Sequence, residues 1–149
     1  PPCVFIRRSP CRPKPLPQVL PHPLPQLLPP CLPTRLLNLW ATWCHPCVEE
    51  MPSLGVLQEK LGSDKLTLVA LNEDRNGAMA AHGFLTRHNL QKIAIYVDTS
   101  GRVPSLMHAH GMPTSFLVDP NGMGIGYIEG GADWSDAATL AFLQSKMKL

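Results

Sequence analysis

The chain has 149 residues, enough for one domain with a buried core. Its 13 basic and 11 acidic side chains give a formal net charge of +2, which is not the electrostatic footprint of a nucleic-acid-binding protein. Because no run of about 18 apolar residues is present, we expect no segment that spans a bilayer. We also recognise no secretory signal, since prolines interrupt every apolar candidate.

Residues 1–33 differ in composition from the rest of the chain. They contain 12 of the 17 prolines, and their charges are all basic. Proline lacks the N–H donor that helices and sheets need, so the composition predicts an extended, polyproline-like or disordered tail. A stiff spacer or a ligand for an aromatic-lined groove is an alternative. The tail also holds Cys3, Cys11 and Cys31, and because the chain has five cysteines, at least one must stay unpaired or pair between chains.

Globular sequence begins at Thr34. The apolar run of residues 36–41 predicts a central strand buried on both faces. A helix is expected from about Pro46 to Leu61, and Trp43-Cys44-His45-Pro46-Cys47 lies at the junction. Two cysteines separated by two residues at a strand-to-helix junction predict reversible dithiol–disulfide chemistry.

The position of each cysteine predicts its role. At the amino end of the helix, unpaired N–H groups and the helix dipole favour a thiolate, so Cys44 should be the nucleophile. Cys47 lies one turn further in and should be the resolving thiol. Pro46 suits the first helical turn, and His45 can stabilise a thiolate when it is protonated. We expect Trp43 to shield that thiolate and to offer an apolar surface to partners.

The remaining pattern predicts an α/β domain. Further strands are expected at residues 66–71, 93–97, 114–119 and 124–129, and further helices at 78–88 and 135–148. Met51, Leu54, Leu57 and Leu61 should form the buried face of the first helix. The expected apolar anchors of the second helix are Met79, Phe84 and Leu85, and Ser135 is expected to cap the last one.

Two blocks of sequence carry a family resemblance. The first is Asn38-Leu-Trp-Ala-Thr-Trp-Cys-His-Pro-Cys-Val-Glu-Glu-Met-Pro52. The second is Gly111-Met-Pro-Thr-Ser-Phe-Leu-Val-Asp119, followed by Pro120-Asn-Gly and Gly130-Gly-Ala-Asp-Trp134. Together they resemble the thioredoxin superfamily, and within it the TlpA, ResA and DsbE branch of bacterial extracytoplasmic thiol-disulfide oxidoreductases, TlpA most closely. The resemblance implies a thioredoxin fold over residues 34–149, with a central mixed sheet flanked by helices.

The resemblance also implies roles for individual residues. Pro113 should have a cis peptide bond and face the cysteine pair, and the backbone of Met112 should pair with a substrate strand. Glu50 matches an acidic residue of this branch, and if it is half-buried its pKa should rise so that it could relay a proton to or from Cys47. A solvated charge like its neighbour Glu49 is the alternative. Many thioredoxins have a buried acid at the position of Asn38, where an amide cannot transfer protons.

The function implied by the resemblance is reduction of disulfides in partner proteins, in cytochrome c maturation or in assembly of cytochrome oxidase from apoproteins awaiting haem or copper. An upstream membrane thiol carrier would supply electrons. No metal or organic cofactor and no nucleic acid partner are expected. The implied location is periplasmic or otherwise extracytoplasmic, with membrane anchoring possible.

Three alternatives remain open from the sequence. A copper-binding chaperone of the same fold could combine the two cysteines with Met107, His108, His110 and Met112 as soft ligands, although an ordinary short helix is the simpler interpretation of that segment. A peroxiredoxin-type peroxidase would use a lone peroxidatic cysteine, whereas a second cysteine follows here. A truncated or frameshifted inactive relative is the third alternative, because the amino-terminal hairpin and strand of the relatives are not recognisable in residues 1–33.

Overall fold

The computed structural model describes residues 33–62 and 64–147. The predicted tail, apart from Pro33, and its three cysteines lie outside the described residues. The elements run in the order β1 (Thr34–Trp40), α2 (His45–Leu61), β2 (Leu66–Asn72), α3 (Gly77–Arg87), β3 (Ile95–Val97), α4 (Val103–Leu106), β4 (Thr114–Val118), β5 (Gly124–Glu129) and α5 (Ala137–Lys146).

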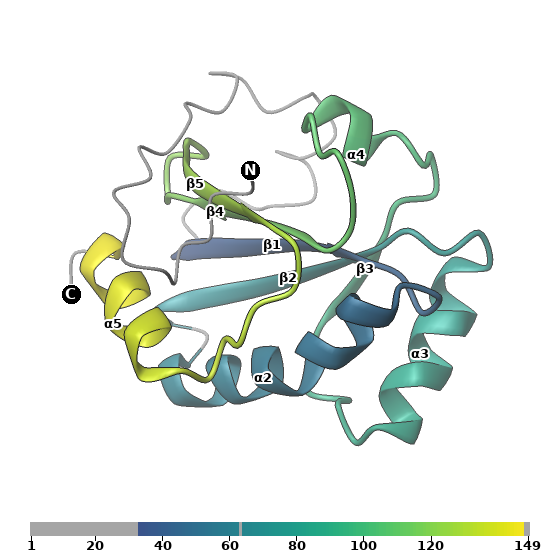
Figure 1. Cartoon of the computed structure of the whole chain (residues 1–149), viewed down its shortest axis with the longest axis horizontal. Helices are drawn as coiled ribbons and strands as arrows, with labels where there is room; N and C mark the ends of the chain where they lie inside the picture. The colour runs from purple at the N-terminus through teal and green to yellow at the C-terminus, as the bar shows by residue number, and fades with distance from the viewer. Residues whose placement is uncertain (1–32, 63, 148–149) are drawn as a thin grey trace.

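The strands form one mixed sheet in the order β3-β2-β1-β4-β5. Strand β1 is central: it pairs in parallel with β2 and antiparallel with β4, and every one of its residues is buried. Strands β2 and β3 are parallel, and the two predicted strands β4 and β5 form an antiparallel hairpin. Helices α2, α3 and α5 lie on one side of the sheet and α4 lies on the other (Figure 1). The expected mixed sheet flanked by helices is confirmed.

Two apolar clusters hold the layers together. The larger one lies under α2, α3 and α5 and includes Leu36, Trp40, Leu54, Phe84 and Leu143. The smaller one packs the opposite side of β1, β2 and β4 against α4. Because β1 contributes alternate residues to the two clusters, its nearly continuous apolar sequence is explained by burial on both faces.

Most predicted elements agree with the structure to within two residues, and the four expected residues on α2 are all buried. Two details of the prediction are wrong. Met79 is no anchor of α3, since it is 82 % exposed while Ala81 is buried in its place. Asp136, not Ser135, caps α5: its carboxylate accepts from the N–H groups of Ala138 and Thr139, whereas the Ser135 hydroxyl donates to Asp133.

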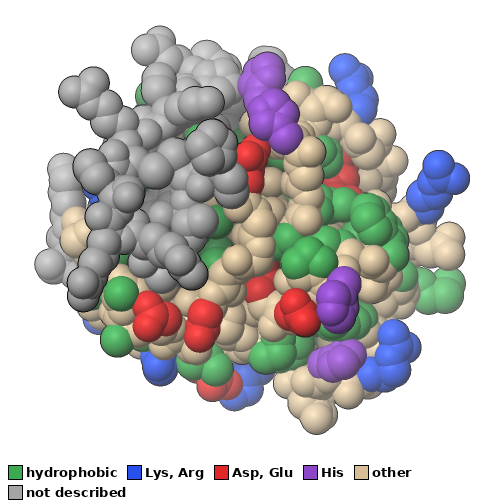
Figure 2. All heavy atoms as spheres, in the orientation of Figure 1, with side chains coloured by type: hydrophobic (Ala, Val, Ile, Leu, Met, Phe, Trp, Pro, Cys, Tyr) green, Lys and Arg blue, Asp and Glu red, His purple; other side chains and the backbone are tan. Residues whose placement is uncertain are grey.

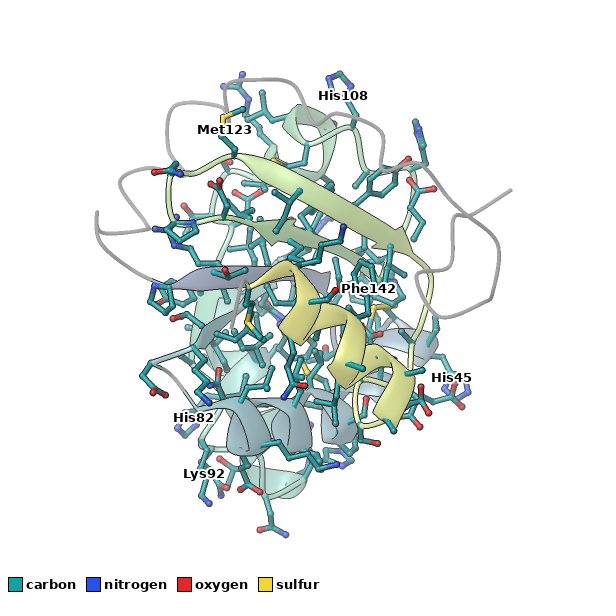
Figure 3. The ribbon with its side chains drawn as sticks, turned by 90° about the vertical axis from the view of Figure 1, so that its left-hand side faces the viewer. His45, His82, Lys92, His108, Met123 and Phe142 are labelled. Carbon is teal, nitrogen blue, oxygen red and sulfur yellow. A yellow bond between two sulfur atoms is a disulfide. The ribbon has the colours of Figure 1, made fainter. Side chains whose placement is uncertain are left out.

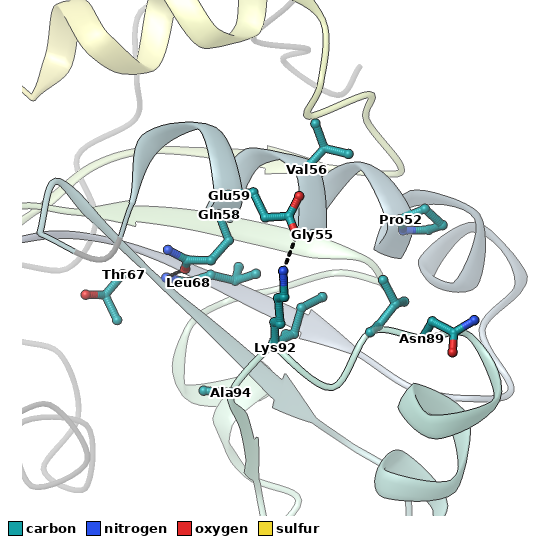
Figure 4. A pocket seen from close by; sticks show the side chains of 12 residues that line it. Pro52, Gly55, Val56, Gln58, Glu59, Thr67, Leu68, Asn89, Lys92 and Ala94 are labelled. Atoms are coloured by element: carbon teal, nitrogen blue, oxygen red, sulfur yellow. Dashed lines mark hydrogen bonds and ion pairs between the residues drawn. The ribbon is translucent and has the colours of Figure 1, made fainter.

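A groove beside the middle of α2 is lined by Pro52, Gly55 and Val56 of the helix and by Leu68 of β2 (Figure 4). The side chain of Gln58 crosses to β2, accepting from the N–H of Leu68 at 2.9 Å and donating to the carbonyl of Leu66 at 3.2 Å. It thus satisfies backbone groups at the start of β2, which lie beyond the short pairing with β3.

Basic side chains lie apart from one another at the margins of the face seen in Figure 2. Among the residues that the structure describes, no helix is both long enough and apolar enough to cross a membrane.

The core of α2 offers a direct test of the fold. Leu57→Ala should lower the free energy of unfolding by about 2–5 kcal/mol, because Leu57 is fully buried and its removal leaves a cavity. Val56→Ala, at the neighbouring exposed position, should change it by only about 0.5 kcal/mol. Urea denaturation of the oxidised proteins measures both values, and equal losses for the two variants would contradict the orientation of α2.

Candidate active site

The two cysteines of the motif lie at the amino end of α2 and are joined by a disulfide, with a Cα–Cα distance of 5.3 Å. Cys44 is the N-cap residue, and its carbonyl accepts from the N–H of Val48. Cys44 is 6 % exposed and Cys47 is completely buried. A partner would therefore reach the sulfur of Cys44 first, as the sequence predicts.

The loop before the cysteines is fastened to β2 by Asp74. Its two carboxylate oxygens accept from the backbone N–H of Thr42 at 2.9 Å and from the Thr42 hydroxyl at 2.8 Å. Asn72 donates to the same carboxylate at 2.7 Å. The sequence analysis assigned no role to Asp74. Its position just after a parallel strand, at the edge where the β1–α2 loop also begins, was the available signal.

An open groove of about 560 Å³ lies beside Cys44, lined by Trp43, Cys44 and Pro46 on one side and by Pro104 and residues 109–112 on the other. The peptide bond between Met112 and Pro113 is cis, as expected. The carbonyl of Pro113 accepts from the N–H of Gly130, whereas the backbone of Met112 makes no hydrogen bond with the described residues. The groove thus brings together the motif and the predicted substrate-binding segment.

The residues expected to tune the cysteines occupy different surroundings. Trp43 is 68 % exposed and presents its ring to solvent at the groove. His45 lies at the exposed start of α2 (Figure 3), with Nε2 at 3.2 Å from Glu49 Oε1. Pro46 lies in the first turn of the helix. Their effects on the thiolate remain predictions.

Glu50 is buried among hydrogen-bond donors, unlike its exposed neighbour Glu49. Its Oε1 accepts from Asn38 Nδ2 at 2.8 Å. Its Oε2 accepts from the N–H of Ala132 at 3.0 Å and from Trp134 Nε1 at 3.1 Å. Trp134 is therefore both a core residue and a donor to this carboxylate, and the sequence did not reveal the second role.

Burial raises the pKa of Glu50 to about 6, and the hydrogen bonds from Ala132, Asn38 and Trp134 oppose that rise. Glu50 lies one helical turn after Cys47, so the two side chains share a face of α2. The predicted burial and raised pKa of Glu50 are present, and its exchange of a proton with Cys47 stays a prediction.

A second perturbed carboxyl was not foreseen. Burial, followed by the neighbouring Asp98, raises the pKa of Glu73 to about 8. Glu73 lines a hollow together with Thr42, Trp43 and Asp74, on the β2 side of the active-site loop.

The residues considered for copper binding are dispersed. Met107 is buried in the smaller core cluster, while His108 and His110 are exposed. Figure 3 shows His108 well apart from His45 at the start of α2. The segment after Leu106 is not helical, so the expected short helix lies earlier, at Val103–Leu106. Within the described ranges, no group of three or more His, Cys, Asp or Glu side chains is arranged to hold a metal ion.

The family model described as Redoxin matches residues 34–140. The chain belongs to the Redoxin family. It is 34 % identical over 94 residues to thiol-disulfide oxidoreductase ResA of Bacillus thuringiensis subsp. konkukian (strain 97-27), covering 63 % of this chain and 53 % of ResA. It is 33 % identical over 90 residues to the thioredoxin-like protein YneN of Bacillus subtilis (strain 168), covering 59 % of this chain and 51 % of YneN. The chain thus spans about half the length of the curated relatives it matches.

Solved structures agree with this membership. A Chlorobium tepidum protein assigned as thiol:disulfide interchange protein DsbE superposes with a TM-score of 0.66 at 29 % identity, over 77 % of this chain and 80 % of that one. StoA from Bacillus subtilis gives a TM-score of 0.60 at 23 % identity, over 73 % of this chain and 82 % of StoA. This similarity supports the fold alone. The predicted thioredoxin fold and similarity to ResA and DsbE are confirmed, and the closer similarity to TlpA stays a prediction.

The buried carboxyl of Glu50 should make stability depend on pH. Its pKa is higher in the folded chain, at about 6, than the ordinary value of 4.5, so ionisation opposes folding. Its stabilising contribution is complete below pH 4.5 and is lost as the pH rises through about 6. Between pH 4.5 and 7 the oxidised wild type should therefore lose about 2 kcal/mol of unfolding free energy relative to Glu50→Gln.

Denaturant unfolding across this pH range measures the difference. The contribution of Glu73 to the pH dependence cancels, because both proteins contain this residue. Glu49→Gln is the matched control, since it removes an exposed carboxyl from the same helix and should follow the wild type. Parallel stability curves for wild type and Glu50→Gln would contradict the burial of an ionisable Glu50.

Proposed function

We propose that the chain is a thiol-disulfide oxidoreductase that reduces disulfide bonds in partner proteins. The observation that carries this proposal is the cysteine pair at the amino end of α2, with Cys44 at the groove and Cys47 buried behind it. Membership of the Redoxin family and similarity to ResA and DsbE proteins support it.

The order of the two reaction steps follows from the accessibility of the two cysteines. In the reduced chain, the Cys44 thiolate attacks one sulfur of the partner's disulfide, forming a Cys44–partner bond while the partner's own S–S bond breaks. Cys47 then loses its proton and attacks the sulfur of Cys44. This step forms the Cys44–Cys47 disulfide and releases the partner's second thiol, so two electrons pass to the partner. The two sulfurs carry these electrons, and the proposal needs no metal or organic cofactor.

Glu50 is proposed as the proton acceptor for Cys47. It is buried one turn along the same helix, and a carboxyl with a pKa of about 6 can both take and return a proton near neutral pH. The resolving thiol has little access to water, because its residue is completely buried. An internal acceptor would therefore speed the second step.

The groove beside Cys44 is proposed to hold an extended segment of the partner. The unpaired backbone groups of Met112 can form main-chain hydrogen bonds with such a segment, and the exposed ring of Trp43 offers an apolar contact. Main-chain recognition tolerates many partner sequences.

The physiological setting is a further part of the proposal. Similarity to ResA and DsbE proteins favours an extracytoplasmic reductant that acts on apocytochromes or on apoproteins of copper sites, in cytochrome c maturation or cytochrome oxidase assembly. After each turnover a membrane thiol carrier would return the cysteine pair to its dithiol form.

Trapping the mixed disulfide tests the reaction. In the full chain with Cys3, Cys11 and Cys31 changed to serine, Cys47→Ser should accumulate a covalent adduct with insulin whose disulfides are intact, because the second step is blocked. Cys44→Ser is the matched control and should form almost none, since the remaining cysteine is buried. Non-reducing electrophoresis and mass spectrometry measure the adducts. Equal adduct formation by the two variants would refute the assigned roles.

A further inference from the structure

The polar group nearest to Glu50 on the sheet is the amide of Asn38. Asn38 is completely buried in β1, and Nδ2 donates both to Glu50 Oε1 at 2.8 Å and to Ser115 Oγ at 2.9 Å. Ser115 lies directly opposite in the β1–β4 register. An amide and a hydroxyl from two paired strands therefore lie on one side of the Glu50 carboxyl.

The hydrogen bonds of Glu50 identify the oxygen that can take a proton. Oε2 already accepts from two donors, Ala132 N and Trp134 Nε1, so its lone pairs are occupied. Oε1 accepts from Asn38 alone. A proton arriving at this carboxyl is therefore bound at Oε1, the oxygen that faces the amide.

One polar atom of the Asn38 amide makes no hydrogen bond with the described residues. Asn38 Oδ1 is buried and has no hydrogen-bond partner among the described residues. A half-turn of the amide would exchange Nδ2 and Oδ1. When Glu50 is protonated, Oδ1 can then accept from the carboxyl and from Ser115, so the turned amide still makes two hydrogen bonds. The Ser115 hydroxyl can rotate to accept from Nδ2 or to donate to Oδ1.

We propose that Asn38 is a positioning residue that turns its amide to match the protonation state of Glu50. With Glu50 ionised, Nδ2 donates to Oε1. With Glu50 protonated, Oδ1 accepts from the Oε1 hydroxyl and from Ser115. The amide transfers no proton itself, but it gives the carboxyl a hydrogen-bond partner in both states.

The inference rests on the proposed function of Glu50 for its place in the reaction. The proton of the Cys47 thiol passes to Glu50 Oε1, leaving a Cys47 thiolate and a neutral carboxyl, and the thiolate then attacks Cys44. The other groups that hold Glu50, namely Ser53, Ala132 and the indole of Trp134, are neutral. Cys47 is the titratable neighbour on the same face of α2.

Side-chain NMR of the reduced full-length wild type tests the proposal without any variant. The carboxyl ¹³C signal of Glu50 and the Nδ2 signals of Asn38 are followed from pH 4.5 to 8. Both should change with the same midpoint, because the amide turns when the carboxyl is protonated. Asn72, an equally buried amide bonded to Asp74 on the next strand, is the control and should not follow that midpoint. An unchanging Asn38 signal while Glu50 titrates would overturn the proposal.

Substitution gives a second readout, the ionisation midpoint of Glu50. Asn38→Leu removes the hydrogen bond from Nδ2 to the carboxylate, and this bond is stronger than the bond to the neutral acid. The ionisation midpoint of Glu50 should therefore rise by about one pH unit, which is roughly a tenfold increase in proton affinity. Asn72→Leu should leave it in place. Equal midpoints in Asn38→Leu and wild type would overturn the inference.

Failure of the proposed function gives a different result. If Glu50 did not serve Cys47, alkylation of the reduced Cys47 would show the same pH profile in wild type and Glu50→Gln. The joint titration of Asn38 and Glu50 would then still be observed.

Discussion

The structure around the cysteine pair depends on the burial of one carboxyl group. Glu50 accepts hydrogen bonds from β1 through Asn38 and from the segment before α5 through Ala132 and Trp134. A buried carboxylate without such donors would cost several kcal/mol. Ser53 extends the connection, since its hydroxyl donates to the carbonyl of Glu50 and accepts from the N–H of Trp134. The central strand, the active-site helix and the closing segment of the domain thus meet at a single side chain.

Two further attachments place the reactive sulfur relative to the groove. Asp74 holds the loop before Cys44 to the end of β2. On the other side, the bond from Gly130 to Pro113 connects the end of the hairpin to the cis-proline segment. Because both attachments start from ends of strands in one sheet, Cys44 and Met112 are held on opposite walls of the same groove. A sheet with short, fixed loops is well suited to a reaction in which two sulfurs must align.

The fold could be read from the sequence because its strongest signals are local. A continuous apolar run predicts the central strand, the cysteine pair marks the start of the next helix, and the resemblance adds the arrangement of the elements. The two wrong predictions concern positions where neighbouring residues compete for the same role. Asp136 caps α5 because Ser135 already bonds to Asp133, and Met79 is exposed because α3 presents Ala81 and Phe84 to the core. The partners of Glu50 are 12 to 84 residues away in sequence, so only the folded chain reveals that Asn38 serves an acid lying on the helix.

The reduction potential of the cysteine pair tests the central claim most directly. The full chain, with Cys3, Cys11 and Cys31 changed to serine, is equilibrated with glutathione buffers at pH 7 while the fluorescence of Trp43, adjacent to Cys44, reports the redox state. A reductant of partner disulfides requires a reversible couple as low as that of thioredoxin, at about −270 mV or below. A value near about −120 mV, typical of a disulfide donor, or the lack of any reversible couple would contradict the account.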